Sequence, residues 1–266
     1  MAMNGIRVDR HNAIRHHLYV HGPSTCQVMA AALGTSMATL RRDLNILEEE
    51  GLIDRVHGGA RLATGSSVEV AFEERKEENL TAKRAIAEIA FQKLRPRSTI
   101  FLDAGTTVLQ LARRLRISPM PITVFTNGLA TAQELLNVPK IRVMILGGQL
   151  RTENASIVGS HAEGMLGGLW FDQLFLGAGA ISPDASIYSV DHDEAALNSK
   201  MLSRSAERFV LVDASKFGRR ATYSVGALDA QLHLIVDSAI TADWRQRLLE
   251  LGVELSIAGE GRQHDQ

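Results

Sequence analysis

The side chains best suited to contact another molecule lie on a short predicted helix that begins at Ser36 and ends before Gly51. Serine is a common N-cap, and glycine often ends a helix in the left-handed conformation. At about 100° per residue, Leu40, Leu44 and Leu47 form an apolar stripe along one side. The residues at the cap, on the opposite side and on its flanks are Ser36, Ala38, Thr39, Arg41, Arg42 and Asn45.

This polar side combines two guanidinium groups, a hydroxyl and an amide within the first turns of the predicted helix. A guanidinium binds guanine O6 and N7 bidentately, and asparagine or threonine can reach other base edges. The alternative is an ordinary amphipathic helix whose charged side is merely solvated, and periodicity alone favours that alternative. The choice therefore depends on the neighbouring elements.

The neighbouring elements favour a DNA-binding module. We expect two helices upstream, at Asp9–His21 and Ser24–Leu33, the second capped by Ser24. A short turn then leads into the third helix, which is the order of a helix-turn-helix whose last helix enters the major groove. Downstream, residues 52–56 and 60–62 predict a two-stranded hairpin, or wing. Its cationic or hydrogen-bonding side chains would be Arg55, His57 and Arg61.

Charge and composition restrict what else the chain can be. The formal net charge of the 266 residues is −1, and residues 1–62 hold seven arginines against six acids, so basic groups would act as a local patch. His17 and His21 lack an acidic or cysteine partner at ligand spacing, and we expect no metal and no cofactor. The single cysteine, Cys26, excludes an internal disulfide. Without a leader or an apolar span, the expected location is the cytoplasm, with no membrane partner.

The chain is expected to contain two domains joined by a small, polar linker at residues 63–70. Residues 1–62 would form the DNA-binding domain, 71–258 an α/β domain, and 259–266 a polar tail. In the α/β domain, short apolar strands alternate with helices, which predicts a parallel sheet covered on both faces. The expected helices are Phe72–Leu94, Asp191–Ala206 and Thr241–Leu251, with others ending near Leu115 and Leu136; the expected strands are Thr99–Asp103, Ile122–Thr126, Ile141–Leu146, Gln173–Leu176, Phe209–Asp213, His233–Asp237 and Val253–Ile257.

Polar and glycine-containing loops follow four of these strands, at residues 103–107, 126–128, 147–148 and 213–216. Each alone could be a simple turn or cap. In an open α/β sheet, however, the ligand binds at the carboxyl ends of the strands. Free N–H groups at a helix start, threonine hydroxyls and a lysine charge would together suit a phosphate, and Asp103 and Asn127 would suit sugar hydroxyls. The predicted ligand-binding residues are Asp103, Gly105, Thr106, Thr107, Asn127, Gly128 and Lys216.

Both parts of the chain resemble the DeoR-type (DeoR/GlpR) repressors of sugar metabolism. The winged helix-turn-helix signature of these repressors is matched by Thr39–Leu44, Leu47, Gly51-Leu52, Arg55 and His57–Ala60. Their sensor domain is matched by Arg75, Asn79, Lys83, Asp103–Thr107, Thr126-Asn127, Gly147-Gly148, Gly159, Asp172, Phe175–Gly177 and Asp213–Phe217. The resemblance implies a fold similar to ribose-5-phosphate isomerases and glucosamine-6-phosphate deaminases, and recognition of a phosphosugar by the loop residues above. Asp184–Tyr188 stands where these sensors often carry Gly-Leu-Thr, in a loop that helps choose the sugar.

Three functions are compatible with these patterns. The leading one is a repressor of a sugar or polyol catabolic operon, which binds double-stranded operator DNA as a dimer or tetramer and leaves it when a phosphorylated effector binds. The second is a phosphosugar isomerase or deaminase with Asp103 and Glu194 as acid and base, although the winged helix would then be unexplained. The third is a structural DNA-binding protein with a vestigial sensor. We expect a regulator that is not an enzyme.

Arg42 lies opposite the leucine stripe and is predicted to read a base. Arg42→Ala should weaken binding to specific DNA by roughly 1–3 kcal/mol and binding to random DNA by less. Titrations of both DNAs at one salt concentration measure the two losses. Equal losses would show that Arg42 contacts only phosphate.

Overall fold

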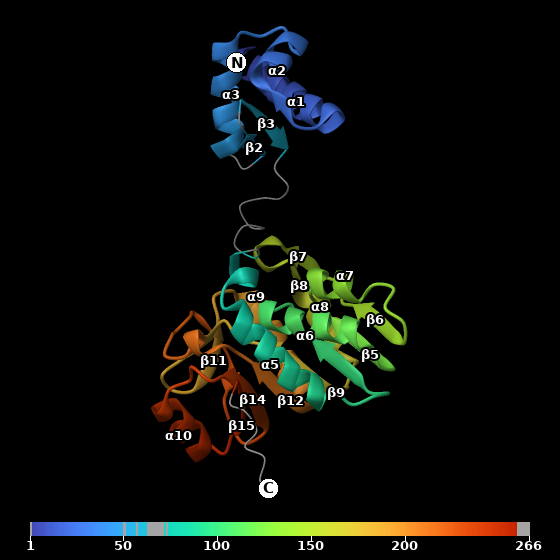
Figure 1. Ribbon diagram of the computed structural model, residues 1–266, viewed down its shortest axis with the longest axis vertical. Helices are drawn as coiled ribbons and strands as arrows, with labels where there is room; N and C mark the ends of the chain where they lie inside the picture. Colours follow the sequence, from blue (N-terminus) through green and yellow to red (C-terminus); the bar gives the residue numbers. More distant parts are fainter. Residues whose placement is uncertain (1, 50–51, 57, 63–71, 73, 260–266) are drawn as a thin grey trace. The chain divides into compact units, whose positions relative to one another are not determined.

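The structure is a computed structural model that describes residues 2–49, 52–56, 58–62, 72 and 74–259. The chain forms two compact units, residues 1–71 and 72–266 (Figure 1). His57, the predicted linker and all but the first residue of the predicted tail lie outside the described residues.

The N-terminal unit is a winged helix-turn-helix, as predicted. Its elements are α1 (Ala2–His21), β1 (Ser24–Thr25), α2 (Cys26–Ala32), α3 (Met37–Glu49), β2 (Ile53–Val56) and β3 (Gly59–Leu62). The leucine stripe of α3 is buried and packs with side chains of α1 and α2, including Ile14, Leu18 and Met29. Burial of this stripe fixes which side of α3 stays in solvent.

The start of α2 differs from the prediction. Thr25, not Ser24, caps the helix, because its Oγ1 accepts a hydrogen bond of 3.4 Å from the Val28 N–H. Ser24 lies one residue earlier in β1, where it pairs with Ala60 of β3. Glycine is required at position 59, since a Cβ there would lie 2.1 Å from the Ser24 carbonyl oxygen. The wing is therefore joined to the helices by a third strand.

The C-terminal unit contains a seven-stranded sheet in which every pairing is parallel. Its strands, in spatial order, are β15 (Glu254–Ala258), β14 (Leu232–Asp237), β12 (Ser205–Leu211), β9 (Phe171–Gly177), β4 (Thr99–Leu102), β5 (Ile122–Thr126) and β6 (Ile141–Ile145). The longer α-helices within the described residues of this unit are α5 (Leu80–Lys93), α6 (Thr106–Ile117), α7 (Leu129–Leu135), α8 (Ser160–Gly167), α9 (His192–Ser203) and α10 (Ala242–Glu250). All seven predicted strands are present, so the α/β prediction is confirmed.

Both faces of the sheet are covered, because successive strand residues point to opposite sides. Ile100 and Leu102 pack with side chains of α5 and α6, such as Ile86 and Leu111. Phe101, between them, packs in a second core with side chains of α8, α9 and α10, among them Leu166, Leu197 and Leu248. This double cover leaves the ends of the strands as the places where polar groups can gather.

Three local predictions for this unit were wrong. The predicted helix Phe72–Leu94 is interrupted at residues 78 and 79, where Asn79 has φ 51° and α5 begins at the next residue. The predicted helix near Asp191–Ala206 ends at Ser203, and β12 begins four residues before the predicted Phe209 because Ser205 pairs with Phe171. The sequence also gave no sign of two smaller antiparallel sheets. These are β7 (Gln149–Arg151) with β8 (Ser156–Val158), and β10 (Ala180–Ile181) with β11 (Ser186–Ser189) and β13 (Tyr223–Ala227).

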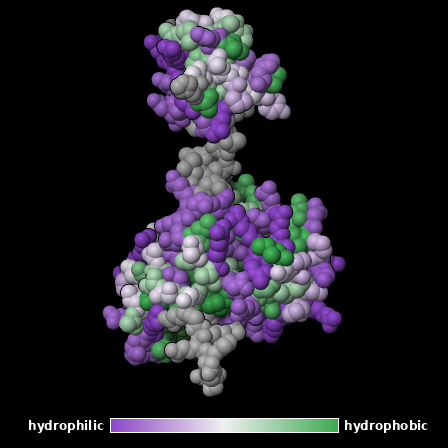
Figure 2. Space-filling model, viewed as in Figure 1, coloured by the Kyte–Doolittle hydropathy of each residue, from purple (hydrophilic) through white to green (hydrophobic). Residues whose placement is uncertain are grey.

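The surface seen in Figure 2 is mostly hydrophilic, with small hydrophobic patches scattered between polar side chains. None of the helices in the described part of the chain is long and apolar enough to cross a membrane.

Candidate functional site

The polar side of α3 has the geometry of a recognition surface. Ser36 caps the helix as predicted, because its Oγ accepts a hydrogen bond of 3.2 Å from the Thr39 N–H. Thr39 is partly exposed, and its Oγ1 lies 2.9 Å from Ser36 Oγ. The exposed predicted residues are Ser36, Ala38, Arg41, Arg42 and Asn45. The opposite side is the buried stripe, so these groups can contact a partner without disturbing the core.

The wing contributes less free charge than the sequence suggests. Arg55 is exposed on β2, as expected for a phosphate contact. Arg61 on β3 instead forms an ion pair of 2.9 Å with Asp54 on β2, and both side chains are about half exposed. Such surface pairs are worth little, so Arg61 can still turn to a phosphate.

Sequence reasoning missed the ion pair that orients α3. Asp43 lies on this helix but is 2% exposed, and its carboxylate is held by Arg10 of α1. Arg10 Nη2 donates to Oδ1 over 2.9 Å and Nε donates to Oδ2, while His11 Nε2 lies 3.3 Å from Oδ1. Burial alone would raise the pKa of Asp43, but the hydrogen bonds and charge of Arg10, with those of His11, lower it below the usual range. The only sequence signal was an acid beside the leucine stripe.

In the C-terminal unit, the four predicted loops follow β4, β5, β6 and β12. Because these strands run parallel in one sheet, the loops lie at the same edge. Gly128, after β5, lies against the β4 loop so closely that a Cβ there would be 2.8 Å from the Ala104 Cα. Glycine is therefore needed for the two loops to pack together.

Asp103 is the buried acid at the centre of these loops. Its Oδ2 accepts hydrogen bonds from the Gly105 N–H (3.2 Å) and the Gly177 N–H (3.1 Å), whereas its buried Oδ1 has no partner among the described residues. Burial, and after it the charge of Glu194, raise the pKa of Asp103 to about 7, despite those backbone bonds. Asp103 can therefore hold a proton near neutral pH and offer either a donor or an acceptor.

Asn127 and the start of α6 provide further polar groups at this edge. The Asn127 Nδ2 donates to the Ile157 carbonyl over 3.3 Å, and its buried Oδ1 has no partner within the described part of the chain. Gly105 precedes α6 without a side-chain cap, and Thr106 and Thr107 form the first turn, with Thr107 buried. The first N–H groups of a helix have no intrahelical partner, which makes this turn suited to an anion.

Lys216 follows β12 and lies in a charged group with Glu78. Its Nζ lies 3.7 Å from Glu78 Oε2, and it is the last residue of the turn that Asp213 caps. Asp213 Oδ1 also accepts a hydrogen bond of 3.0 Å from Asn79 Nδ2. Lys83 is buried nearby and donates to the Arg75 carbonyl; burial lowers its pKa, which the charge of Asp213 partly offsets.

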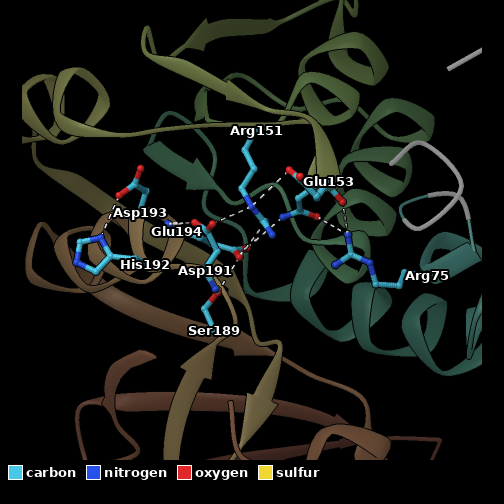
Figure 3. Close-up of polar contacts among 9 residues, drawn as sticks. Arg75, Arg151, Glu153, Ser189, Asp191, His192, Asp193 and Glu194 are labelled. Carbon is cyan, nitrogen blue, oxygen red and sulfur yellow. Dashed lines mark hydrogen bonds and ion pairs between the residues drawn. The ribbon is translucent and has the colours of Figure 1, made fainter. Parts of the chain in front are cut away.

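A further polar cluster was not predicted from spacing, and it centres on Glu194 of α9 (Figure 3). Glu194 accepts hydrogen bonds from Ser189 Oγ (2.8 Å), Asn154 Nδ2 (3.1 Å) and Arg151 Nη1 (3.2 Å). The sequence signal was the pair Asp191 and Glu194, which has the spacing of an N-cap and its third helical residue, and the Glu194 N–H does donate to Asp191 Oδ1.

These features define a class of protein: a winged-helix DNA-binding regulator with an α/β ligand-sensing unit. Residues 10–65 match the DeoR-like helix-turn-helix domain, and residues 78–238 match the DeoR C terminal sensor domain. The chain belongs to the DeoR family of transcriptional regulators, and it is a regulator rather than an enzyme.

Curated relatives match along most of the chain. The HTH-type transcriptional regulator GlpR of Haloferax volcanii is 36% identical over 83% of this chain and 86% of its own. The HTH-type transcriptional repressor CsqR of Escherichia coli K12 is 32% identical over 94% of this chain and 95% of its own. The glycerol-3-phosphate regulon repressor of the same strain is 29% identical over 94% of this chain and 99% of its own. Among solved structures, ribose 5-phosphate isomerase A of Methanocaldococcus jannaschii has a TM-score of 0.39 and 16% identity, over 53% of this chain and 55% of that one.

Asp43 is expected to hold α3 in the orientation that DNA binding requires. Asp43→Asn keeps the shape but removes the charge, and should lower the free energy of unfolding of the N-terminal unit by about 1–3 kcal/mol. It should also reduce the preference for operator over random DNA. Asp54→Asn, which breaks the exposed pair with Arg61, is the control and should cost less than about 0.5 kcal/mol of stability. Equal effects of the two changes would contradict this role for Asp43.

The raised pKa of Asp103 predicts a pH dependence of stability. Between its ordinary pKa of 3.8 and its folded value of about 7, the folded unit holds a proton that the unfolded chain has lost. Its stabilising contribution is therefore full below pH 4 and is lost as the pH rises toward 7. Asp103→Asn should make the slope of unfolding free energy against pH less negative by up to about 1.4 kcal/mol per pH unit in this window.

Fluorescence measures that slope in denaturant titrations, because both tryptophans, Trp170 and Trp244, lie in the C-terminal unit. Asp229→Asn, in an exposed turn, controls for the loss of one charge. An unchanged slope in Asp103→Asn would show that Asp103 is ionised throughout the window.

Proposed function

We propose that this protein represses a sugar or polyol catabolic operon and leaves its operator when a phosphorylated sugar or polyol binds the C-terminal unit. It would act in the cytoplasm. It would be a homo-oligomer, because helix-turn-helix proteins commonly bind paired half-sites. The proposal that an effector binds is supported by one observation: acceptor oxygens and cations occur together at one edge of the parallel sheet.

Both halves of a phosphosugar have suitable partners at this edge. Asp103 Oδ1 and Asn127 Oδ1 are buried with no partner among the described residues, and sugar hydroxyls could donate to them. An unpaired buried acceptor costs free energy that such a donor would recover. The phosphate would be met by the first turn of α6 and by Lys216, whose side chain is 17% exposed and therefore still reachable.

The DNA part of the proposal is supported by the exposed polar side of α3 and by the names of the relatives. One of these is named as the repressor of a glycerol-3-phosphate regulon, which involves a phosphorylated polyol. For effector binding to weaken DNA binding, the effector must prefer a sensor arrangement that binds the operator poorly. A coupling of about 1–3 kcal/mol would give a 5- to 150-fold response.

The direct test is a mobility-shift assay on the DNA upstream of this gene with a panel of phosphorylated and free sugars and polyols. The panel should include glycerol 3-phosphate, fructose 6-phosphate and their unphosphorylated forms. Release by at least one phosphorylated compound, but not by its free form, is the expected result. DNA binding that no member of the panel alters would argue for a regulator without a phosphosugar effector.

Lys216→Ala provides a sharper test of the phosphate contact. The variant should bind the operator normally without effector but respond poorly to it, because the phosphate would lose its point charge. Lys200→Ala, in the last turn of α9, removes the same charge elsewhere in the unit and should respond like the wild type. Release of Lys216→Ala at the wild-type effector concentration would exclude Lys216 from the site.

A further inference from the structure

We infer that Glu194, Asn154 and Arg75 form a hydrogen-bonded chain that connects the effector site to the segment entering the C-terminal unit. We call this the Glu194–Asn154–Arg75 relay. It would carry the effect of ligand binding toward the linker and the DNA-binding unit. Its role in the response rests on the proposed function, but its existence can be tested without any ligand.

The relay begins at the ligand edge of the sheet. Glu194 is near enough to Asp103 for its charge to contribute to the raised pKa of that residue. Its carboxylate accepts hydrogen bonds from Ser189, Asn154 and Arg151, and Arg151 Nε also lies 3.3 Å from Asp191 Oδ2. A sugar hydroxyl that donates to Glu194 would compete with these donors, so ligand binding would change how strongly Asn154 is held.

Asn154 is the connecting group because both ends of its amide are used. Nδ2 donates to Glu194 Oε1 over 3.1 Å, and Oδ1 accepts from Arg75 Nη2 over 3.0 Å. The side chain is 3% exposed, and an amide is planar and rigid. A rotation that alters the bond to Glu194 therefore alters the bond to Arg75 as well.

A second route from the ligand edge reaches the same loop. The Leu129 N–H donates to the Ala155 carbonyl over 2.9 Å, and the Ile157 N–H donates to the Asn127 carbonyl over 2.7 Å. Asn127 is one of the predicted effector-binding residues. Movement at Asn127 would therefore be transmitted through the backbone to residues 154–157, next to the Asn154 side chain.

The relay ends on the first helical residues of the C-terminal unit. Arg75 lies four residues after Ala71, the last residue of the N-terminal unit, and belongs to the helical run 74–77. Arg75 Nη2 also donates to the Glu153 carbonyl over 2.9 Å, and the Arg75 carbonyl accepts from Lys83 Nζ. The left-handed Asn79 separates this run from α5, and the Lys83 bond links the two.

Hydrogen exchange of the full chain without ligand tests whether the relay exists. Glu194→Gln weakens the first link, and should speed exchange of the Glu78 amide, which is bonded to the Glu74 carbonyl, by roughly threefold or more. Glu88→Gln is the matched control. Glu88 lies on α5 and forms an ion pair with Arg114 on α6, so this change removes the same charge and should leave exchange at residues 74–78 unchanged.

The Arg75→Met background separates the relay from general loosening. With the last link absent, Glu194→Gln should no longer alter exchange at residues 74–78, so the two changes should not be additive. If Glu194→Gln speeds exchange equally in both backgrounds, or not at all, the relay is wrong. Should Glu194→Gln fail to fold, Arg75→Met alone decides: it should speed exchange of the Ala155 amide, and no change there would overturn the inference.

The response to effector is the second arm, measured with the panel member that releases DNA most strongly. Arg75→Met should bind that compound within about twofold of the wild type in the absence of DNA, because Arg75 is proposed to transmit rather than to bind. Addition of the compound lowers the operator affinity of the wild type by some factor, and the corresponding factor for Arg75→Met should be at least fivefold smaller. A wild-type response would overturn the coupling role. If no panel member releases DNA, the proposed function fails, and the exchange arm still decides whether the relay exists.

Discussion

Parallel pairing of the seven strands is the constraint on which the sensor site depends. Because all the strands run in the same direction, the loops after β4, β5, β9 and β12 meet at one edge although they are far apart in sequence. The helices on both faces then cover the apolar strands. Asp103, Asn127 and Asp213 are brought to one edge by topology, and not by any local attraction between them.

This arrangement buries titratable and polar groups at the edge, which is unfavourable for folding. Asp103 is buried beside the charge of Glu194, so its pKa rises, and Lys83 is buried so that its pKa falls. Buried acceptor oxygens at this edge, among them Asp103 Oδ1, Asn127 Oδ1 and Asp213 Oδ2, have no hydrogen-bond partner among the described residues. Buried groups of this kind destabilise a fold unless a partner binds them, and they mark binding sites for that reason. An edge of this kind can respond to a ligand because the ligand supplies the missing partners.

In the N-terminal unit, a small hydrophobic core supports the exposed polar side of α3. The leucine stripe of α3 provides the burial, and the Arg10–Asp43 pair fixes how the helix is rotated and placed on α1. A buried ion pair adds little net stability, but a misplaced helix would leave the Asp43 charge unpaired. The pair therefore favours a single orientation of the helix, which is what base recognition requires.

The sequence alone determined what depends on local pattern. Leucine spacing and the Ser36 cap defined α3, apolar runs located all seven strands, and glycine and polar residues marked the loops at their ends, so the fold class and much of the candidate site could be predicted. Partners distant in sequence could not, because periodicity carries no information about them: Arg10 with Asp43, Gly177 with Asp103, and Arg75 with Asn154. The break at Asn79 was also hidden, since the flanking residues are compatible with one continuous helix. Only tertiary packing decided which polar side chains became buried, and burial gives Asp103, Asp43 and Asn154 their roles.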